Sequence, residues 1–148
     1  MSRPPIRVLI ADDHQLFAEA LSMALDADPR LHVVAHARDG REAVKLAVAL
    51  EPEVVLMDID MPLVDGIQAT RAICHSLPIR VAMLTGSPRP DDALRARDAG
   101  AAAYLTKGCS AQDVVEAVLE LATPPTQPPR VRAVGAPRLL QFRPGLAH

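Results

Sequence analysis

The sequence predicts an α/β domain: a doubly wound parallel sheet of five strands with helices on both faces. Five short apolar segments alternate with five amphipathic segments along the 148-residue chain. Continuous apolar runs of this length are typical of strands that are buried on both faces, as in parallel sheets. Strict alternation of strand and helix places the helices on both sides of such a sheet.

The strands are expected at short apolar runs, four of which end in polar side chains. The first run, IRVLIA, is followed at once by Asp12 and Asp13, and the third, VVLMD, ends in Asp58. The fourth run ends in Thr85 and the fifth in Lys107. The five expected strands are Ile6–Ala11, Leu31–Ala37, Val54–Asp58, Arg80–Thr85 and 102–107.

The helices are expected where apolar residues recur at helical spacing, and capping patterns mark several of their starts. Asp39 and Glu42 form a capping-box pattern, and Ser110 and Asp113 are placed to cap the last helix. Pro90 suits the first turn of a helix. The expected helices are 14–27, 39–50, 66–77, one that starts near residue 90, and 110–122.

Composition and charge exclude several classes of protein. The apolar run near the N-terminus is too short for a secretory signal, and no run approaches the roughly 18 apolar residues of a membrane span. Cys74 and Cys109 are isolated from each other, without CxxC spacing. A net charge of −2 gives no overall attraction to nucleic acid or membrane. We therefore expect a cytoplasmic protein that does not bind a membrane.

The carboxyl ends of parallel strands lie at one edge of the sheet, where functional groups gather. Here that edge receives Asp12, Asp13, Asp58, Thr85 and Lys107. Clustered carboxylates repel one another unless a cation compensates, and oxygen ligands suit Mg²⁺. A carboxylate beside Mg²⁺ can act as a nucleophile on a phosphoryl group. A lysine and a threonine hydroxyl can stabilise the phosphoryl oxygens.

Four motifs stand together in this chain: the acidic pair at 12–13, DIDMPLVDG at 58–66, Thr-Gly at 85–86 and YLTK at 104–107. Through these motifs the chain from residue 6 to about 122 resembles the receiver domain of two-component response regulators. This resemblance implies a flavodoxin-like fold with strand order 2-1-3-4-5. The segments ADDHQLFAEAL and YLTKG are most similar to regulators with a LuxR-type helix-turn-helix output.

The resemblance implies Asp58 as phosphoacceptor and a Mg²⁺ site around it. Asp13 and Asp58 would bind the metal directly, and Asp12 would assist through water. The main-chain carbonyl of Asp60 would be a further ligand, so the Asp60 side chain is not required for the chemistry. His14, which follows the acid pair, is expected to start a helix near the metal rather than to bind it.

The resemblance also implies a switch. Lys107 would hold the phosphoryl group, Thr85 would move to meet it, and Tyr104 would swing inward when Thr85 shifts. Receivers often carry proline after the lysine, whereas this chain has Gly108. Glycine is conformationally permissive, so the direction of the lysine side chain is less constrained by the backbone.

The expected function is phosphorylation-dependent regulation of a partner, in transcriptional regulation, rather than enzymatic turnover of a separate substrate. The expected partners are a sensor histidine kinase and, on phosphorylation, a second copy that docks on the face made by 81–85, 102–107 and the last helix. One alternative is a receiver-like module that works without phosphate. Another is a haloacid-dehalogenase-like phosphatase, whose DxD motif lies on the first strand, unlike the pair Asp58 and Asp60.

The domain is expected to end at residue 122, followed by a Pro-rich basic tail over 123–148. This tail carries four arginines and no acidic residue, and proline-rich sequence favours an extended, disordered linker. DNA binding is not expected within this chain, because a helix-turn-helix needs several amphipathic helices and the tail shows none.

Overall fold

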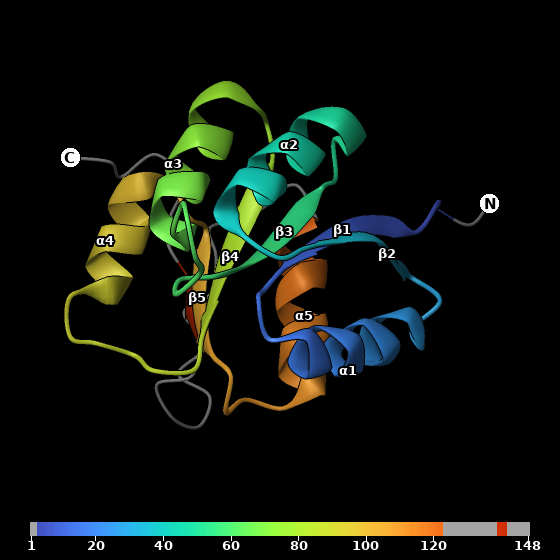
Figure 1. Ribbon diagram of the computed structural model, residues 1–148. Helices are drawn as coiled ribbons and strands as arrows, with labels where there is room; N and C mark the ends of the chain where they lie inside the picture. Colours follow the sequence, from blue (N-terminus) through green and yellow to red (C-terminus); the bar gives the residue numbers. More distant parts are fainter. Residues whose placement is uncertain (1–2, 123–138, 142–148) are drawn as a thin grey trace.

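A computed structural model describes residues 3–122 and 139–141, and the chain alternates strand and helix as expected (Figure 1). Each expected strand and helix is present within a few residues of its predicted bounds. Their order is β1 (Ile6–Ala11), α1 (Gln15–Asp26), β2 (Leu31–Ala37), α2 (Gly40–Leu50), β3 (Val54–Asp58), α3 (Gly66–Ser76), β4 (Arg80–Thr85), α4 (Asp92–Ala99), β5 (Ala103–Thr106), α5 (Ala111–Ala122) and β6 (Leu139–Gln141).

The strands form one sheet in the order β2-β1-β3-β4-β5-β6. The first five strands are parallel and have the predicted order 2-1-3-4-5. The sixth is antiparallel to β5, and the sequence predicts no strand there. The tail over 123–148 is predicted to be disordered, and within it the structure describes only the strand 139–141; the rest of this prediction lies outside the described residues.

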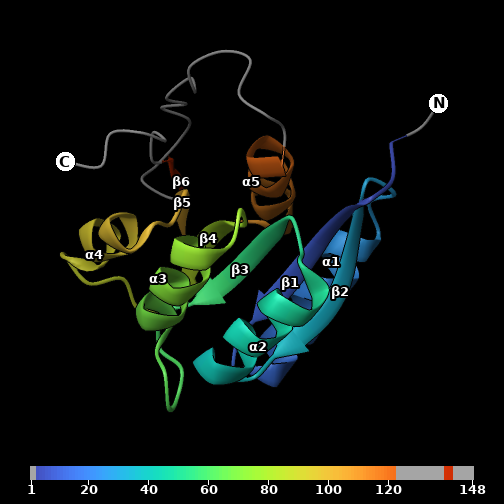
Figure 2. The same ribbon diagram turned by 90° about the horizontal axis from the view of Figure 1, so that it is seen from above.

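Two apolar layers hold the helices against the sheet, because alternate residues of each strand point to opposite faces. In β3, Val55 and Met57 pack on the side of α2, α3 and α4, whereas Val54 and Leu56 pack on the side of α1 and α5. All four of these side chains are buried. Figures 1 and 2 show these helices on the two faces of the sheet.

Three helix starts follow capping chemistry. The Asp39 carboxylate accepts a hydrogen bond from the Glu42 amide at 2.8 Å. Ser110 and Asp113, which are predicted to cap the last helix, form a reciprocal pair of hydrogen bonds, each 3.1 Å long. A capping box between Asp65 and Gln68 starts α3, and although its sequence pattern was visible, we did not predict it. Helix α4 starts two residues after Pro90.

Gly66 allows the start of α3 to approach the end of β3 closely. A Cβ atom at this position would overlap the carbonyl oxygen of Asp58. The Gly66 amide instead donates a hydrogen bond of 2.8 Å to the carbonyl of Ile59. The backbone around Asp58 is therefore fixed by a helix start that tolerates glycine alone. No helix within the described residues is both long and apolar enough to cross a membrane.

Candidate functional site

Four neighbouring strands deliver the predicted site residues to one edge of the sheet. Asp12 and Asp13 follow β1, Asp58 ends β3, Thr85 ends β4 and Lys107 follows β5. Because β1, β3, β4 and β5 are consecutive in the sheet, these residues meet at its carboxyl edge. Asp12, Asp58 and Thr85 are buried, and Asp13 is exposed.

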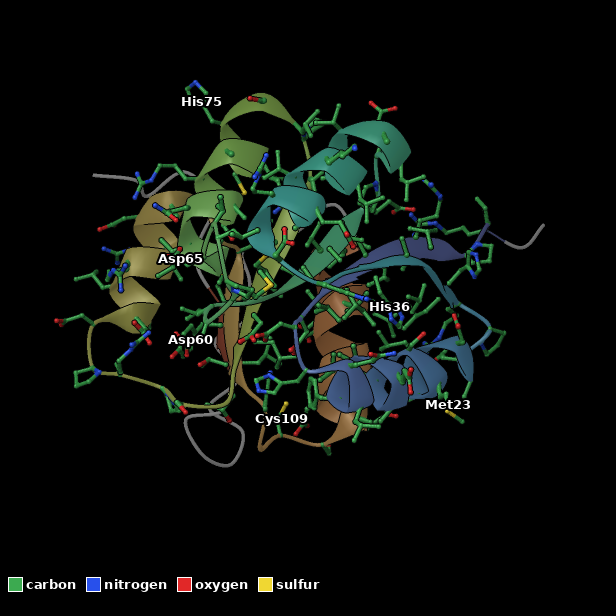
Figure 3. All side chains as sticks on the ribbon, in the orientation of Figure 1. Met23, His36, Asp60, Asp65, His75 and Cys109 are labelled. Atoms are coloured by element: carbon green, nitrogen blue, oxygen red, sulfur yellow. The ribbon has the colours of Figure 1, made fainter. Side chains whose placement is uncertain are left out.

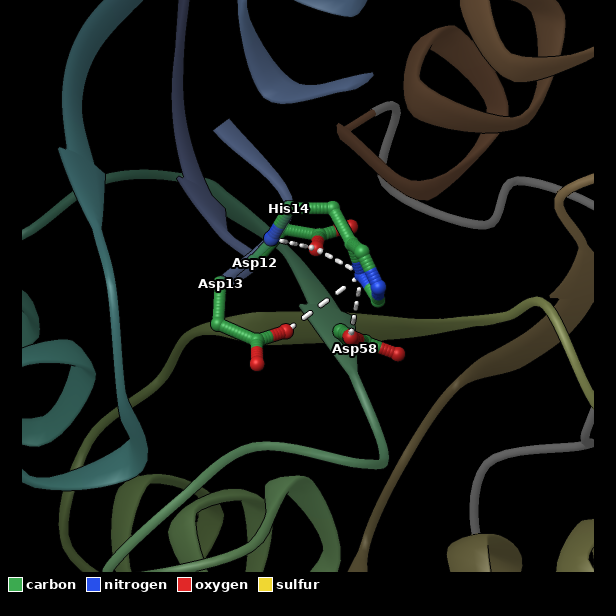
Figure 4. A group of neighbouring side chains, drawn as sticks. All are labelled: Asp12, Asp13, His14 and Asp58. Atoms are coloured by element: carbon green, nitrogen blue, oxygen red, sulfur yellow. Dashed lines mark hydrogen bonds and ion pairs between the residues drawn. The ribbon is translucent and has the colours of Figure 1, made fainter. Parts of the chain in front are cut away.

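Three carboxylates and one imidazole converge at this edge (Figure 4). One ligand atom from each of Asp12, Asp13, His14 and Asp58 lies within 4.8 Å of every other. His14 Nδ1 lies 3.2 Å from Asp12 Oδ1, 3.4 Å from Asp13 Oδ1 and 3.9 Å from Asp58 Oδ2. His14 occupies the N-cap position of α1, as predicted.

Lys107 supplies the positive charge of the site. Its Nζ lies 2.7 Å from Asp12 Oδ2 and 3.5 Å from Asp58 Oδ2. The same ammonium lies 4.7 Å from the centre of the Phe17 ring, a cation–π distance. These contacts direct the lysine side chain into the acid cluster although Gly108 follows it.

Burial and a neighbouring acid disfavour the ionised form of Asp58. Removal from water has the larger effect and the charge of Asp12 the next, and together they raise the pKa of Asp58 from 3.8 to about 6. Lys107 and a hydrogen bond from the Asp60 backbone act in the opposite direction. Above about pH 6 the carboxylate is ionised and nucleophilic, and a further cation would stabilise it.

The donor set fits a hard divalent cation. Within the described part of the chain, Asp58 Oδ2 is buried without a hydrogen-bond partner, and such atoms require an explanation. Asp12, Asp13 and Asp58 provide carboxylate oxygens, which Mg²⁺ prefers. Lys107 pairs with Asp12 and Asp58, and one ammonium does not balance three carboxylates. A bound Mg²⁺ would both balance the remaining charge and supply a partner for Asp58 Oδ2.

The family described as "Response regulator receiver domain" matches residues 8–119. The chain belongs to this family. A receiver therefore accounts for the sheet order and for the acid cluster at its carboxyl edge. This finding overturns the haloacid-dehalogenase-like alternative.

Known relatives of this receiver include transcriptional regulators. The transcriptional regulatory protein LiaR of Bacillus subtilis is 40% identical over 114 residues, which is 76% of this chain and 54% of LiaR. This chain thus spans about half the length of LiaR. The similarity to regulators of the LuxR lineage, predicted from the sequence, is confirmed by these relatives and by solved structures.

Two solved structures share the receiver fold. The signal receiver domain of the putative response regulator NarL from Mycobacterium tuberculosis has a TM-score of 0.78 and 36% identity. That match covers 81% of this chain and 98% of that one. A LuxR-family two-component response regulator from Aurantimonas has a TM-score of 0.76 and 32% identity, with 80% and 85% of the two chains covered.

The two residues of the predicted switch are both buried in this receiver. The Thr85 hydroxyl accepts a hydrogen bond of 3.2 Å from the Ser87 amide. Tyr104 is 7% exposed, so its side chain already lies inside, and among the described residues its hydroxyl has no hydrogen-bond partner. Burial, followed by the negative charge of Asp92, raises the pKa of Tyr104.

The Asp60 side chain contacts the segment between β4 and α4, and Figure 3 labels its position. Its Oδ1 accepts a hydrogen bond of 2.8 Å from Arg89 Nη2. Arg89 Nε also lies 3.2 Å from Asp92 Oδ2, and the Asp92 side chain is buried. Arg89 therefore links the loop after Asp58 to the start of α4.

Three residues around the receiver site were not given these roles from the sequence. His14 was placed near the metal, but its contact with all three carboxylates depends on its rotamer. Phe17 falls within the expected helix 14–27, and its place under Lys107 depends on how α1 lies relative to the end of β5. Arg89 lies in a loop without periodicity, and no sequence signal pairs it with Asp60.

Proposed function

We propose that this receiver accepts a phosphoryl group on Asp58 from a sensor histidine kinase, in a reaction that depends on Mg²⁺. The observation that carries the proposal is the buried Asp58 carboxylate, whose Oδ2 faces Lys107 at 3.5 Å and has no hydrogen-bond partner among the described residues. A phosphoryl group placed there would meet the lysine ammonium. Asp12 and Asp13 complete the set of oxygens around it.

In this mechanism, one Asp58 oxygen attacks the phosphorus of a phosphohistidine. The P–N bond breaks as the new O–P bond forms, and the electron pair of the broken bond stays on the imidazole nitrogen. Lys107 balances charge on the phosphoryl oxygens. Asp13, Asp58 and the Asp60 carbonyl would hold Mg²⁺, with assistance from Asp12, and the bound ion would supply electrostatic stabilisation to the transferred group.

The phosphorylated state is proposed to be read out through Thr85 and Tyr104. The Thr85 hydroxyl, which accepts a hydrogen bond from the Ser87 amide, would move so that its own O–H donates to a phosphoryl oxygen. That movement would change the packing beside Tyr104, because β4 and β5 are paired strands. A charge-adding event coupled to a two-state packing element is a general form of switch.

The output is proposed to be transcriptional regulation, by analogy with relatives such as LiaR. This part of the proposal rests on the relatives, since the chain spans 54% of LiaR. A partner domain or protein would then read the switch.

Incubation with acetyl phosphate and Mg²⁺, followed by intact mass measurement, tests the proposal. The wild type should gain the mass of one phosphoryl group, and Asp58→Asn should gain none. Asp13→Asn should gain it more slowly and should need more Mg²⁺. Labelling of Asp58→Asn at an unrelated residue would contradict the assignment of the phosphoacceptor. A wild type that never gains the mass would favour the module that works without phosphate.

A further inference from the structure

The acid cluster of this receiver contains one nitrogen ligand among the described residues, the imidazole of His14. Figure 4 shows this ring turned toward the three carboxylates, with an interaction drawn to each of them. Oxygen ligands suit Mg²⁺, whereas imidazole is a ligand that divalent transition metals favour. The proposed phosphoryl transfer to Asp58 assigns no role to this ring.

The distances around the imidazole match those between atoms that bind one metal ion. Bonds of about 2.1 Å at tetrahedral angles separate neighbouring ligand atoms by about 3.4 Å. His14 Nδ1 lies 3.2 Å from Asp12 Oδ1 and 3.4 Å from Asp13 Oδ1. The longer distance of 3.9 Å to Asp58 Oδ2 needs only a small rotation of the ring. The His14 side chain is 67% exposed, so packing does not oppose this rotation.

The backbone of His14 is held in place although its ring is exposed. The His14 amide donates a hydrogen bond of 2.8 Å to Asp12 Oδ1. The His14 carbonyl accepts one of 3.0 Å from the Ala18 amide, at the start of α1. Only side-chain torsions therefore remain to be fixed when Nδ1 binds an ion, and such preorganisation lowers the entropic cost of binding.

Neither tautomer of His14 suits all the neighbours of Nδ1. Lys107 Nζ lies 3.3 Å away, and an ammonium can only donate, so this contact requires a lone pair on Nδ1. Ionised carboxylates can only accept, so their contacts require a hydrogen on the same atom. A metal ion removes this conflict, because the Nδ1 lone pair and the carboxylate oxygens then all bind the ion. Lys107 would keep Asp12 Oδ2, which is not the Asp12 oxygen nearest His14.

The Asp58 carboxylate independently points to a cation at the same place. Its Oδ2 is buried without a hydrogen-bond partner among the described residues. The Asp58 side chain is 2% exposed, so bulk water does not solvate this oxygen. A cation between Asp58 Oδ2 and His14 Nδ1 would give both atoms a partner.

We propose that His14 is a metal ligand through Nδ1, and that the site therefore binds a divalent transition metal such as Co²⁺ or Zn²⁺ more tightly than it binds Mg²⁺. Mg²⁺ would use oxygen ligands alone, with His14 beside it, as expected for a hard ion. The two kinds of ion would compete for Asp58. The proposal rests on the metal site of the proposed function, but it requires no phosphoryl transfer.

Calorimetric titration of the untagged full chain with Mg²⁺ and with Co²⁺ tests this proposal. The wild type should bind Co²⁺ more tightly than Mg²⁺. In His14→Gln, the Kd for Co²⁺ should rise at least about tenfold, since even outer-shell partners of metal ligands contribute roughly 10- to 100-fold to affinity. The Kd for Mg²⁺ should stay unchanged in this variant, which also shows that the acid cluster remains folded.

His36→Gln is the matched control. His36 is exposed on β2 and lines a groove together with Asp12 and Asp13, but it lies outside the group that His14 forms with the carboxylates. This variant should bind both ions as the wild type does. Equal losses of Co²⁺ affinity in His36→Gln and His14→Gln would overturn the proposal, because His14 would then have no special role.

Proton NMR of the Co²⁺-bound protein reports ligation directly. Co²⁺ is paramagnetic, so ring protons of a ligating histidine should shift far outside their ordinary range. These signals should be absent in His14→Gln and should weaken in excess Mg²⁺, because the two ions share Asp58. Co²⁺ binding that His14→Gln leaves unchanged would overturn this proposal alone. A wild type that binds neither ion would contradict both this proposal and the Mg²⁺ dependence of the proposed function.

Discussion

Asp58→Asn should stabilise the fold above neutral pH while it abolishes phosphorylation. In the folded protein the pKa of Asp58 is raised from 3.8 to about 6, first by burial and then by Asp12. At about 1.4 kcal/mol per pKa unit, this rise corresponds to about 3 kcal/mol. Asparagine has nearly the same shape and carries no charge, so the variant avoids this cost.

The stabilisation should depend on pH in a defined direction. Above about pH 6 the Asp58 carboxyl is ionised in both the folded and the unfolded chain, and the folded state bears the full cost. As the pH falls from 6 toward 3.8, the folded state becomes protonated first, and the cost disappears. The difference in free energy of unfolding between Asp58→Asn and the wild type therefore shrinks as the pH falls from 6 toward 3.8.

Urea denaturation at about pH 8 and about pH 4.5 measures this difference. We expect Asp58→Asn to exceed the wild type in free energy of unfolding by up to about 3 kcal/mol at the higher pH, and by much less at the lower. Mg²⁺ should reduce this difference in free energy of unfolding at the higher pH, because a bound cation stabilises the ionised Asp58 carboxylate of the wild type. Asp91→Asn is the control, since Asp91 is exposed and, in the described chain, makes no side-chain cap hydrogen bond. A difference in free energy of unfolding between Asp58→Asn and the wild type that is equal at both pH values would refute the electrostatic explanation.

Three further substitutions test the geometry. Gly66→Ala should lower the free energy of unfolding by about 2 kcal/mol or more, because its Cβ would overlap the Asp58 carbonyl; an unchanged urea midpoint would contradict this close approach. Tyr104→Phe should raise the free energy of unfolding by about 1 kcal/mol, because it removes a buried hydroxyl that has no hydrogen-bond partner among the described residues. A lower free energy of unfolding in this variant would contradict an unpaired hydroxyl. A double-mutant cycle of Arg89→Gln and Asp60→Asn should give a coupling of about 0.5 kcal/mol, since both side chains are more than half exposed; a coupling above about 2 kcal/mol would contradict a solvent-screened pair.

The sheet and the core of the site were predictable because both follow from short-range patterns. A strand that is apolar throughout and ends in an acid places that acid at the carboxyl edge, wherever its neighbours lie in the chain. This is why Asp12 and Asp58 were expected together, and the structure places them in contact with the same lysine.

Features that depend on rotamers and on non-local pairing were not predictable. His14 and Arg89 reach their partners through side-chain directions that no spacing specifies. Strand β6 is three residues long, which is too short for a periodic signal, and it lies between prolines in a segment whose composition favours a linker. Its pairing depends on β5, a strand that lies 34 residues earlier at the paired residues Leu105 and Leu139.

The separation of the acids from their lysine along the chain has a consequence for folding. Asp12 and Lys107 meet at 2.7 Å, although nearly the whole domain lies between them in sequence. A partly folded chain that had assembled β1 and β3 alone would hold three carboxylates together with no lysine beside them, and their repulsion would oppose that intermediate. Addition of β5 brings the compensating charge, so the acids favour assembly of the sheet as one cooperative unit. Contacts between residues so far apart in sequence also slow folding. Added salt screens the repulsion between the carboxylates, so it should speed the association of β1 and β3 that precedes the addition of β5.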